Sequence, residues 1–483
     1  MVEQDLIKLI NNVKASKTED NYLELKSAKG GTPNIYNTLS SFSNQDGGGI
    51  IIFGINETDN LDICGVKDAT SLRLNIQKQC KEMYPNVNAI ISSAVIDGKT
   101  VVCAEIPGVD IYERPVYYKG SGVINGSYKR VGDRDEKMSP YEVYSYEAYK
   151  KRIKDDERIV EGVDEILINK ALVEEYLNKV KKDRPNFQKT MTDEKVLEVM
   201  GLKHDNHWTI AGLLLFSNFP QEKFKQFSII AMAIPGLVKG MSNEINERFL
   251  DDKRIMGPIQ EMLDEAIVFV EKNSKKPIVI NSDGRRITRT EYPMEAVREA
   301  ILNTLVHRDY SIYTEGTPIS LEMYSDRMEI KNPGGIYGNE PIENLGRVNI
   351  NTRNEALANA LEILGITENR YSGIPRIRQL FEEAKLKMPV FKVEKGEFVV
   401  IFYNSGETKD EFRRSKRKDL EEKIINYCVK PRTRQEIVDY MNLSYFYIIN
   451  VLLKGLIEKG KIELTIPDKP RSAKQRYISG GVG

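Results

Sequence analysis

The stretch REAILNTLVHRDY, residues 298–310, decides how the largest part of this chain is interpreted. Its apolar residues recur at helical spacing, while Glu299, Asn303 and His307 follow one another at intervals of four. On an α-helix this spacing stacks a carboxylate, an amide and an imidazole along one face. The pattern indicates a candidate functional site. The alternative is that Glu299 and His307 cap or brace the corner where the helix ends.

Two further stretches follow this helix. PISLEMYSDRMEIKNPGG, residues 318–335, alternates apolar and polar residues around Ser325 and Asp326, which predicts a β-hairpin that runs into a glycine turn. RYSGIPRIRQLFEEA, residues 370–384, places Ser372 and Gly373 at the start of another helix. The free N–H groups and the positive dipole end of a helix start suit a phosphate.

In this order, the motifs resemble those of the gyrase and histidine-kinase type of ATPase, the Bergerat fold. The resemblance is closer to a divergent branch that occurs in ATP-binding transcriptional regulators and helicase-related proteins. Four ordered motifs within about 290–400 carry it: REAILNTLVHRDY, NPGG, TRNEALANAL and YSGI. It implies that ATP binds with Mg²⁺, with Glu299 as catalytic base and Asn303 as metal ligand. The implied nucleotide-binding residues are Glu299, Asn303, His307, Asn332, Gly334, Gly335, Arg353, Asn354, Ser372 and Gly373.

Two positions depart from the wider ATPase pattern. Asn332 stands where an aspartate usually accepts a hydrogen bond from the adenine amino group, and its side-chain carbonyl can still accept that bond. Tyr371 replaces the first glycine of the phosphate loop. We therefore expect nucleotide binding with slow hydrolysis at most.

Near the N-terminus, Glu19, Glu24 and Lys26 precede the helix NIYNTLSSFSN and a buried strand that ends at Gly54. If residues 22–26 form a strand, Glu24 and Lys26 share one of its faces. The pattern resembles the Schlafen AlbA-type domain over most of residues 15–146. The resemblance implies either nucleic-acid binding or an RNase site in which Glu19, Glu24 and a third acid hold Mg²⁺ or Mn²⁺.

The third acid of that site is displaced in this chain. Asn56 stands where the family has aspartate, and Glu57 follows it directly in the sequence. The candidate catalytic residues of this site are therefore Glu19, Glu24, Lys26 and Glu57. A shift of one residue in a strand reverses the facing of the side chain. The alternative is a non-catalytic fold that retains a Glu24–Lys26 ion pair.

A basic and aromatic cluster around residues 117–134 indicates contact with nucleic acid. Cations interleaved with rings can bind phosphates and stack on bases. The candidate residues are Tyr128, Lys129, Arg130 and Arg134. The alternative is the surface of an ordinary β-hairpin.

Composition narrows the class of protein. The 483 residues include 71 Lys and Arg against 71 Asp and Glu, so net charge names no partner. The four cysteines are far apart, which argues against a zinc site or a disulfide framework. We find no membrane span and no signal peptide, and we expect a cytoplasmic protein.

The last segment, residues 413–483, contains 16 Lys and Arg against 8 Asp and Glu, an excess of eight positive charges. Residues 418–478 predict three helices followed by two strands, the order of a winged helix. Thr433 and Glu436 form a predicted capping box before the second helix.

The sequence therefore predicts an α+β multidomain protein with a Schlafen AlbA-type α/β module, a divergent Bergerat-like α/β sandwich and a C-terminal winged helix. The predicted segments are 1–146 (AlbA-type), 147–189 (helical charged connector), 190–405 (ATP-binding region), 406–417 (basic linker) and 418–483 (winged helix).

The expected function is an ATP-responsive DNA-binding regulator that binds DNA or RNA and forms a homo-oligomer. Two alternatives remain open: a metal-dependent nuclease gated by ATP, acting in phage defence, and a nucleotide-dependent assembly protein.

Overall fold

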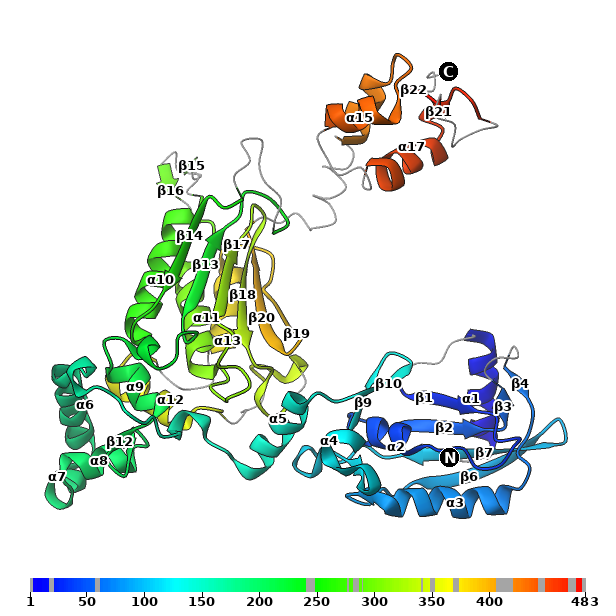
Figure 1. The fold of residues 1–483 in the computed structure, drawn as a ribbon, viewed down its shortest axis with the longest axis horizontal. Coiled ribbons are helices and arrows are strands. Elements are labelled where there is room, and N and C mark those ends of the chain that lie inside the picture. The colour runs from blue at the N-terminus through cyan, green and yellow to red at the C-terminus, as the bar shows by residue number, and fades with distance from the viewer. Residues whose placement is uncertain are drawn as a thin grey trace. The chain divides into compact units, whose positions relative to one another are not determined.

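The computed structural model describes residues 3–16, 21–56, 61–239, 248–275, 278–280, 286–288, 290–339, 342–347, 352–367, 373–404, 420–441, 448–467 and 475–479. Its contacts divide the chain into two compact units, residues 1–402 and residues 403–483. Helices and several separate sheets alternate along the chain (Figure 1). The prediction of a mixed α/β protein with several domains is confirmed.

A four-stranded sheet forms the centre of the N-terminal region. Its described strands, in spatial order, are β1 (Leu23–Lys26), β2 (Gly49–Phe53), β7 (Lys99–Ile106) and β6 (Ile90–Ile96). The strands β1 and β2 run parallel, and the other two pairs are antiparallel. A parallel pair needs a crossover connection, which α2 (Tyr36–Ser43) supplies.

Helices cover both faces of this sheet. The described helices are α1 (Glu3–Ser16), α2 and α3 (Ala69–Glu82). Ile51 and Phe53 of β2 share an apolar cluster with α2 and α3, whereas Leu25 of β1 belongs to the cluster that includes α1. Side chains alternate along a strand, so Glu24 points to the side of α2.

Short elements connect this sheet to the rest of the first unit. They are β3 (Ile55–Asn56), β4 (Asp62–Ile63), β5 (Met83–Tyr84), η1 (Ile111–Glu113), β8 (Tyr117–Tyr118), η2 (Lys119–Ser121), α4 (Gly122–Gly126), β9 (Tyr128–Val131), β10 (Arg134–Lys137) and α5 (Pro140–Lys151). The hairpin β9–β10 leads directly into α5. A capping box between Ser139 and Glu142 begins α5 and satisfies its first free N–H groups.

The following helices belong to the main core. They are η3 (Asp155–Glu157), η4 (Glu165–Leu167), α6 (Lys170–Asp183), α7 (Pro185–Thr190), α8 (Asp193–Val199), α9 (Ile210–Phe216) and η5 (Pro220–Glu222), with the hairpin β11 (Lys203–His204) and β12 (His207–Trp208) between α8 and α9. One face of α6 buries Tyr176, Leu177 and Val180 in the same cluster as the central sheet described next. Residues 170–183, predicted as part of a charged connector, therefore pack as part of this domain.

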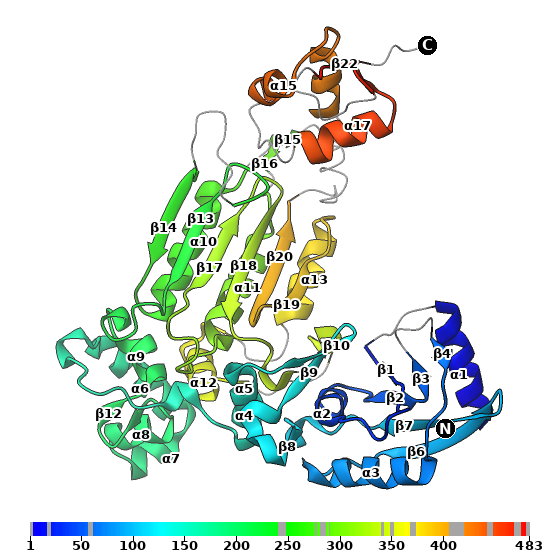
Figure 2. The ribbon, with the colours of Figure 1, turned by 45° about the vertical axis from the view of Figure 1, so that its right-hand side comes forward.

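Six described strands form the central sheet. In spatial order they are β14 (Asp251–Ile255), β13 (Ile229–Ala233), β17 (Ile319–Met323), β18 (Arg327–Pro333), β20 (Glu397–Tyr403) and β19 (Val390–Glu394). The predicted hairpin is confirmed, because β17 pairs antiparallel with β18 and Met323 lies opposite Met328. On one face of the sheet lie α10 (Ile259–Asn273), α11 (Met294–His307) and α13 (Gly373–Glu383) (Figure 2). The region also includes β15 (Ile278–Ile280), β16 (Arg286–Thr288), η6 (Tyr337–Asn339), η7 (Ile342–Asn344) and α12 (Glu355–Leu364).

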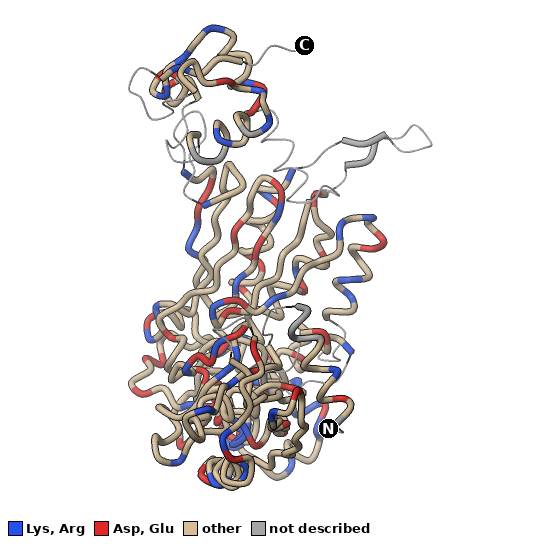
Figure 3. The backbone as a smooth tube through the Cα atoms, turned by 90° about the vertical axis from the view of Figure 1, so that its right-hand side faces the viewer, with Lys and Arg blue, Asp and Glu red and all other residues tan. Residues whose placement is uncertain are grey.

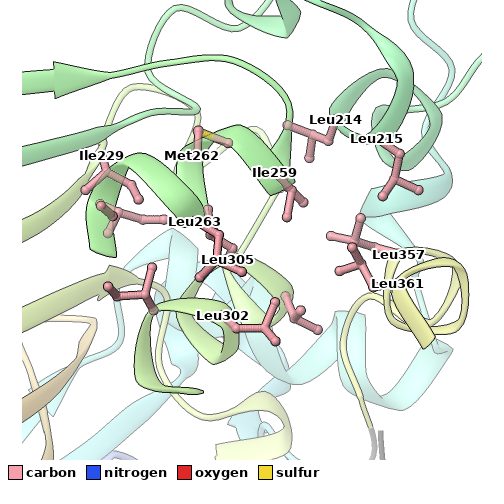
Figure 4. Close-up of a cluster of buried hydrophobic side chains, with 14 of the residues drawn as sticks. Leu214, Leu215, Ile229, Ile259, Met262, Leu263, Leu302, Leu305, Leu357 and Leu361 are labelled. Atoms are coloured by element: carbon pink, nitrogen blue, oxygen red, sulfur yellow. The ribbon is translucent and has the colours of Figure 1, made fainter. Parts of the chain in front are cut away.

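The core of this domain lies where helices from distant parts of the sequence meet the sheet. Apolar side chains of α9, α10, α11 and α12 converge with Ile229 of β13 (Figure 4). Leu302 and Leu305 of α11 are each 1% exposed. Because this side of α11 is fixed in the core, its polar side chains are held on the remaining faces.

Charge is mixed along the first unit. Figure 3 shows Lys and Arg interspersed with Asp and Glu in the described parts of the chain. Every described helix is too short or too polar to cross a lipid bilayer.

The second unit contains a helical segment at residues 420–427, then α15 (Arg434–Met441), η8 (Ile448–Leu453) and α17 (Lys454–Glu458). The strands β21 (Ile462–Leu464) and β22 (Tyr477–Ser479) pair antiparallel. The predicted capping box is confirmed: Glu436 accepts bonds from the Thr433 backbone N–H at 2.8 Å and its hydroxyl at 2.9 Å, and the Glu436 N–H donates to the hydroxyl at 3.3 Å.

Candidate functional site

The structure brings together Glu299, Asn303 and Gly373, which the sequence predicts as nucleotide-binding residues. The Asn303 Nδ2 donates to Glu299 Oε1 at 3.1 Å, one turn along α11. A Cβ on Gly373, the first residue of α13, would lie 2.3 Å from that Oε1 and 2.7 Å from the Nδ2. Arg376 of α13 binds Glu295 of α11 through two bonds of 2.7 and 3.0 Å. The start of α13 is therefore held against the carboxylate and the amide, with room for a glycine alone.

Asn332 lies on β18, on the side of the sheet that faces the helices. Its neighbours at alternate positions, Met328 and Ile330, belong to the main core, and α11 contacts this strand. Asn332 is 4% exposed, and its Oδ1 has no hydrogen-bond partner among the described residues. A buried acceptor without a donor is costly, so the fold holds Asn332 in a position that favours an added donor. The adenine amino group is such a donor.

The bond between Asn303 and Glu299 uses the amide nitrogen of Asn303. This arrangement leaves the amide oxygen, the atom that ligates Mg²⁺, for a cation. The residues present therefore fit a Mg²⁺-nucleotide. Asn332 would accept from the adenine base, Asn303 would ligate the cation, and Glu299 lies next to Asn303. Ser372 lies outside the described residues.

The HRDY corner at the end of α11 is a buried ion-pair centre. The carboxylate of Asp309 forms an ion pair with Arg353, and both side chains are at most 6% exposed. Tyr141 and the backbone N–H of Ser311 also donate to Asp309, at 2.7 and 2.8 Å. Burial favours a raised pKa for Asp309, but the charge of Arg353 and these hydrogen bonds outweigh it and lower the pKa.

The glycine turn after β18 packs against this centre. A Cβ on Gly334, whose φ is +100°, would lie 2.6 Å from the Cβ of Asp309 and 2.9 Å from Nη1 of Arg353. Arg353 also donates to the carbonyl of Gly335 at 3.2 Å. Close packing of the corner therefore explains the first glycine without any nucleotide. A Cβ on Gly335 would meet only Val393, at 3.6 Å.

Arg353 and Asn354 brace this region. Asn354 is 0% exposed and donates to the carbonyls of Val306 and Arg308, at 2.8 and 2.7 Å, where α11 ends. These bonds satisfy carbonyls that the helix leaves free. Contact of Arg353 or Asn354 with nucleotide stays a prediction, since the described contacts of both are with protein groups.

His307 is the last residue of α11. Its imidazole keeps exposed surface, yet the protein around it and the nearby charge of Arg353 lower its pKa to about 4. The ring is therefore neutral at pH 7. It suits hydrogen bonding or packing better than charge pairing with a phosphate.

The N-terminal acid Glu24 is committed to cations of the protein. Its Oε2 accepts from Arg130 Nη1 at 2.8 Å, and its Oε1 pairs with Lys26. Arg130 also binds Asp135 at 3.0 Å, and Asp135 accepts from Ser41 of α2 at 2.5 Å. The predicted Glu24–Lys26 pair is therefore present within a larger network.

Glu19 and Glu57 lie outside the described residues. Among the residues that are described, no group of three His, Cys, Asp or Glu side chains is placed to hold a metal ion. Asn56 pairs with Asp62 in the short β3–β4 ladder. The assignment of a metal to Glu19 and Glu24 stays a prediction.

The predicted nucleic-acid residues separate by exposure. The side chain of Arg130 is 1% exposed and its charge is paired, so it is unavailable to a phosphate in this structure. Lys129 is partly exposed and pairs with Glu142 of α5 at 2.6 Å, whereas Arg134 is 83% exposed. Tyr128 is partly buried, and its backbone carbonyl accepts from Asn44.

The tyrosines of α5 join the two domains, and none of the sequence motifs includes them. Tyr141 binds Asp309, and Tyr144 donates to both carboxylate oxygens of Asp155 at 2.8 Å. The ring of Tyr149 lies 5.0 Å from that of Tyr337, in the segment after the glycine turn. The available signal was YEVYSYEAY, residues 141–149, whose repeated tyrosines span the predicted boundary at residue 146.

Comparison with protein families identifies two segments. Residues 19–139 match the family model described as "Schlafen, AlbA_2". Residues 316–402 match the model HATPase_c_4, described as "Putative ATP-dependent DNA helicase recG C-terminal". Both resemblances are confirmed. Residues 19–139 are thus similar to the Schlafen AlbA family and residues 316–402 to the RecG C-terminal family, and the two parts of the chain are called the AlbA-type domain and the ATPase-type domain below.

The ATPase-type match begins after α11. The roles of Glu299 and Asn303 therefore rest on their motif and on the packing of Gly373, whereas Asn332 lies inside the matched residues.

The chain also aligns with solved structures, two of which follow. A Corynebacterium diphtheriae crystal structure aligns at 17% identity over 99% of this chain and 97% of that chain, with a TM-score of 0.39. The N-terminal domain of a RecG-related protein from Nitrosomonas europaea aligns at 23% identity over 27% of this chain and 91% of that chain, with a TM-score of 0.22. At these scores neither alignment carries an argument about function. No curated protein matches the chain.

Proposed function

We propose that this protein binds Mg²⁺-ATP in its ATPase-type domain, binds nucleic acid through its AlbA-type domain, and changes its nucleic-acid affinity with nucleotide state. The observation that carries the first part is the buried Oδ1 of Asn332, which lies on the same side of the sheet as α11 and has no hydrogen-bond partner in the part of the chain that the structure describes. A Bergerat-like sandwich accounts for this arrangement, since the sheet has α10, α11 and α13 on one face.

Binding is favoured over rapid turnover. Glu299 accepts a hydrogen bond from the Asn303 amide in place of a water molecule, and a side chain on residue 373 would collide with both groups. When bound, Mg²⁺ supplies charge neutralisation at the phosphates. The chain's own residues have three roles. Glu299 orients the amide of Asn303, Gly373 keeps any side chain out of the space beside them, and Asn332 presents an acceptor to the adenine base.

For the AlbA-type domain, the pairing of Glu24 supports binding rather than cleavage. A carboxylate that already neutralises Arg130 and Lys26 is a weaker ligand for a divalent cation. The surface cations Lys129 and Arg134 remain the proposed phosphate contacts. A nuclease that uses Glu19, Glu24 and Glu57 is the alternative that the experiment below tests.

The second unit is proposed to be a winged helix. Its described helices precede the β21–β22 hairpin, and residues 413–483 carry the excess of eight positive charges. We propose that it contributes backbone contacts to duplex DNA. Regulation of transcription is the proposed role of the whole chain.

Coupling between the two domains is proposed to run through α5. Its Glu142 pairs with Lys129 of the β9–β10 hairpin, and its Tyr141 binds Asp309 at the HRDY corner. A nucleotide that binds one arrangement of the HRDY corner more tightly increases the population of that arrangement. Because α5 contacts both the corner and the β9–β10 hairpin, the positions of α5 and of the hairpin shift with it.

The test is fluorescence anisotropy of the full chain with labelled single-stranded DNA, RNA and duplex DNA. Each is measured without nucleotide, with Mg²⁺-ATP, and with Mn²⁺, followed by gel analysis of the same oligonucleotides. We expect intact oligonucleotides and an affinity that changes with ATP. Cleavage that depends on Mn²⁺ would establish the nuclease instead, and equal affinity with and without ATP would refute the coupling.

A further inference from the structure

A cavity of about 370 Å³ lies between the AlbA-type domain, α5 and the HRDY corner. Tyrosines contribute much of its lining: Tyr84 of β5, Tyr117 of β8, Tyr144 of α5 and Tyr313. The cavity lies outside the nucleotide motifs, and it shares Tyr117 with the basic and aromatic cluster around residues 117–134. Its volume lies within the range of about 300–1,000 Å³ that is usual for ligand sites.

The rings are arranged as two pairs on separate parts of the first unit. The centroids of Tyr84 and Tyr117 are 5.5 Å apart, and those of Tyr144 and Tyr313 are 4.9 Å apart. One ring of each pair is held by the fold, because β5 pairs with β8 and Tyr144 donates to Asp155. The other ring of each pair is presented to solvent, since Tyr84 is 51% exposed and Tyr313 is 46% exposed.

Charge at the cavity favours an anionic ligand. Glu147 lines it but is paired with Lys151 at 2.7 Å, one turn along α5. Lys150 also lines it and has an exposed side chain. The lining is thus aromatic and carries one cation, Lys150, and one carboxylate, which Lys151 outside the lining neutralises. Aromatic rings beside an exposed ammonium suit flat rings joined to a phosphate.

We propose that this cavity binds one or two unstacked bases of a single-stranded nucleic acid, with Lys150 at the adjoining phosphate. The inference deepens the proposed function and rests on nucleic-acid binding by this protein. It places a base-stacking site between the two domains, where Tyr313 follows the Asp309 corner by four residues. Bases held there contact both the AlbA-type and the ATPase-type parts of the chain.

The experiment compares single-stranded 12-mers, labelled for anisotropy, on the wild type and on Tyr84→Ala and Tyr313→Ala. Stacking on an aromatic ring is worth about 1–3 kcal/mol per base, so each alanine is expected to weaken binding roughly fivefold to a hundredfold. Tyr84→Phe and Tyr313→Phe retain a ring and are expected to bind as the wild type does. Phe219→Ala removes an exposed ring outside the cavity, at 41% exposure, and is the matched control.

A 2-aminopurine base in the oligonucleotide supplies an independent readout, because its fluorescence is quenched when it stacks. Quenching that both alanine variants remove supports the proposal. Unchanged affinity and quenching in both variants, with binding by the wild type intact, overturn the cavity site and leave the proposed function standing. Absence of binding by the wild type to DNA and RNA overturns both. Binding that tetramethylammonium displaces as effectively as a nucleotide does would show a cation cage and refute the base site.

Discussion

The hydroxyl of Tyr141 donates a hydrogen bond of 2.7 Å to Oδ2 of Asp309, a residue 168 positions later in the chain. Tyr141 belongs to α5, the helix that closes the AlbA-type region, and Asp309 belongs to the HRDY corner that follows α11. Burial and the carboxylate together raise the pKa of Tyr141 to about 12, so the phenol remains a donor at neutral pH. This bond is a direct polar connection between the two domains.

Tyr141→Phe is expected to lower the free energy of unfolding of the first unit by roughly 2 kcal/mol, because a hydrogen bond to a buried charged group is lost. It is also expected to reduce the effect of ATP on nucleic-acid affinity. Chemical denaturation and anisotropy measure the two effects. Tyr112→Phe, which removes a hydroxyl from an exposed contact with Tyr149 at 3.2 Å, is the control. An equal loss of stability in both variants would show that the domain contact is unimportant.

Asn303→Ala is expected to abolish Mg²⁺-dependent ATP binding, since it removes the amide oxygen from the cation position. Glu299→Gln retains a polar group beside Gly373 and is expected to bind ATP while losing any slow hydrolysis. Titration calorimetry with and without Mg²⁺ measures binding. Glu271→Gln, on the exposed side of α10, should leave the heats unchanged. Equal heats for wild type and Asn303→Ala would make the polar face of α11 structural.

Asp156 predicts an unusual pH dependence of stability. It is 0% exposed, and its Oδ2 accepts from the backbone N–H of Leu357 at 3.1 Å at the start of α12. Burial raises its pKa from 3.8 to about 7. Between these values the folded state holds more protons than the unfolded state, so this group's contribution to stability falls as pH rises.

Asp156→Asn keeps an acceptor for Leu357 and cannot ionise. We expect it to gain roughly 4 kcal/mol over the wild type at pH 8, and the gain should shrink toward pH 4. Urea denaturation at several pH values gives the difference, in which the opposite contribution of His307 cancels. Asp183→Asn, an exposed residue of α6, is the control. A difference that does not vary with pH would contradict the assignment.

Glu24→Gln is expected to destabilise the AlbA-type domain by roughly 3 kcal/mol, because it removes a charge from the buried guanidinium of Arg130. Loss of any nuclease activity in this variant must therefore be compared with its melting temperature. Glu136→Gln, an exposed change on β10, should leave melting unchanged. Retained stability in Glu24→Gln would show that Arg130 is sufficiently compensated by Asp135.

Removal of residues 413–483 is expected to weaken binding to duplex DNA and to reduce its dependence on salt. The excess of eight positive charges implies release of several counterions on binding. Anisotropy at two salt concentrations, with light scattering for the oligomer mass, provides the measurement. Unchanged affinity with an altered mass would make this segment a pairing module.

Local patterns determined much of the fold. Period-two alternation predicted the β17–β18 hairpin, and helical spacing placed Glu299 and Asn303 on one face of α11. The Thr433–Glu436 capping box needs residues only three apart. Such features are set by the geometry of a single element, so the sequence alone contains them.

Tertiary structure decided which of these residues are committed to other partners. The ion pair of Asp309 with Arg353, the burial of Arg130 beside Glu24 and the contact of Tyr141 with Asp309 all join residues far apart in the sequence. The sequence does not show whether a charged side chain is solvated or is buried against a counter-charge. Its availability to a ligand depends on desolvation and on neighbours that only packing brings within hydrogen-bond distance.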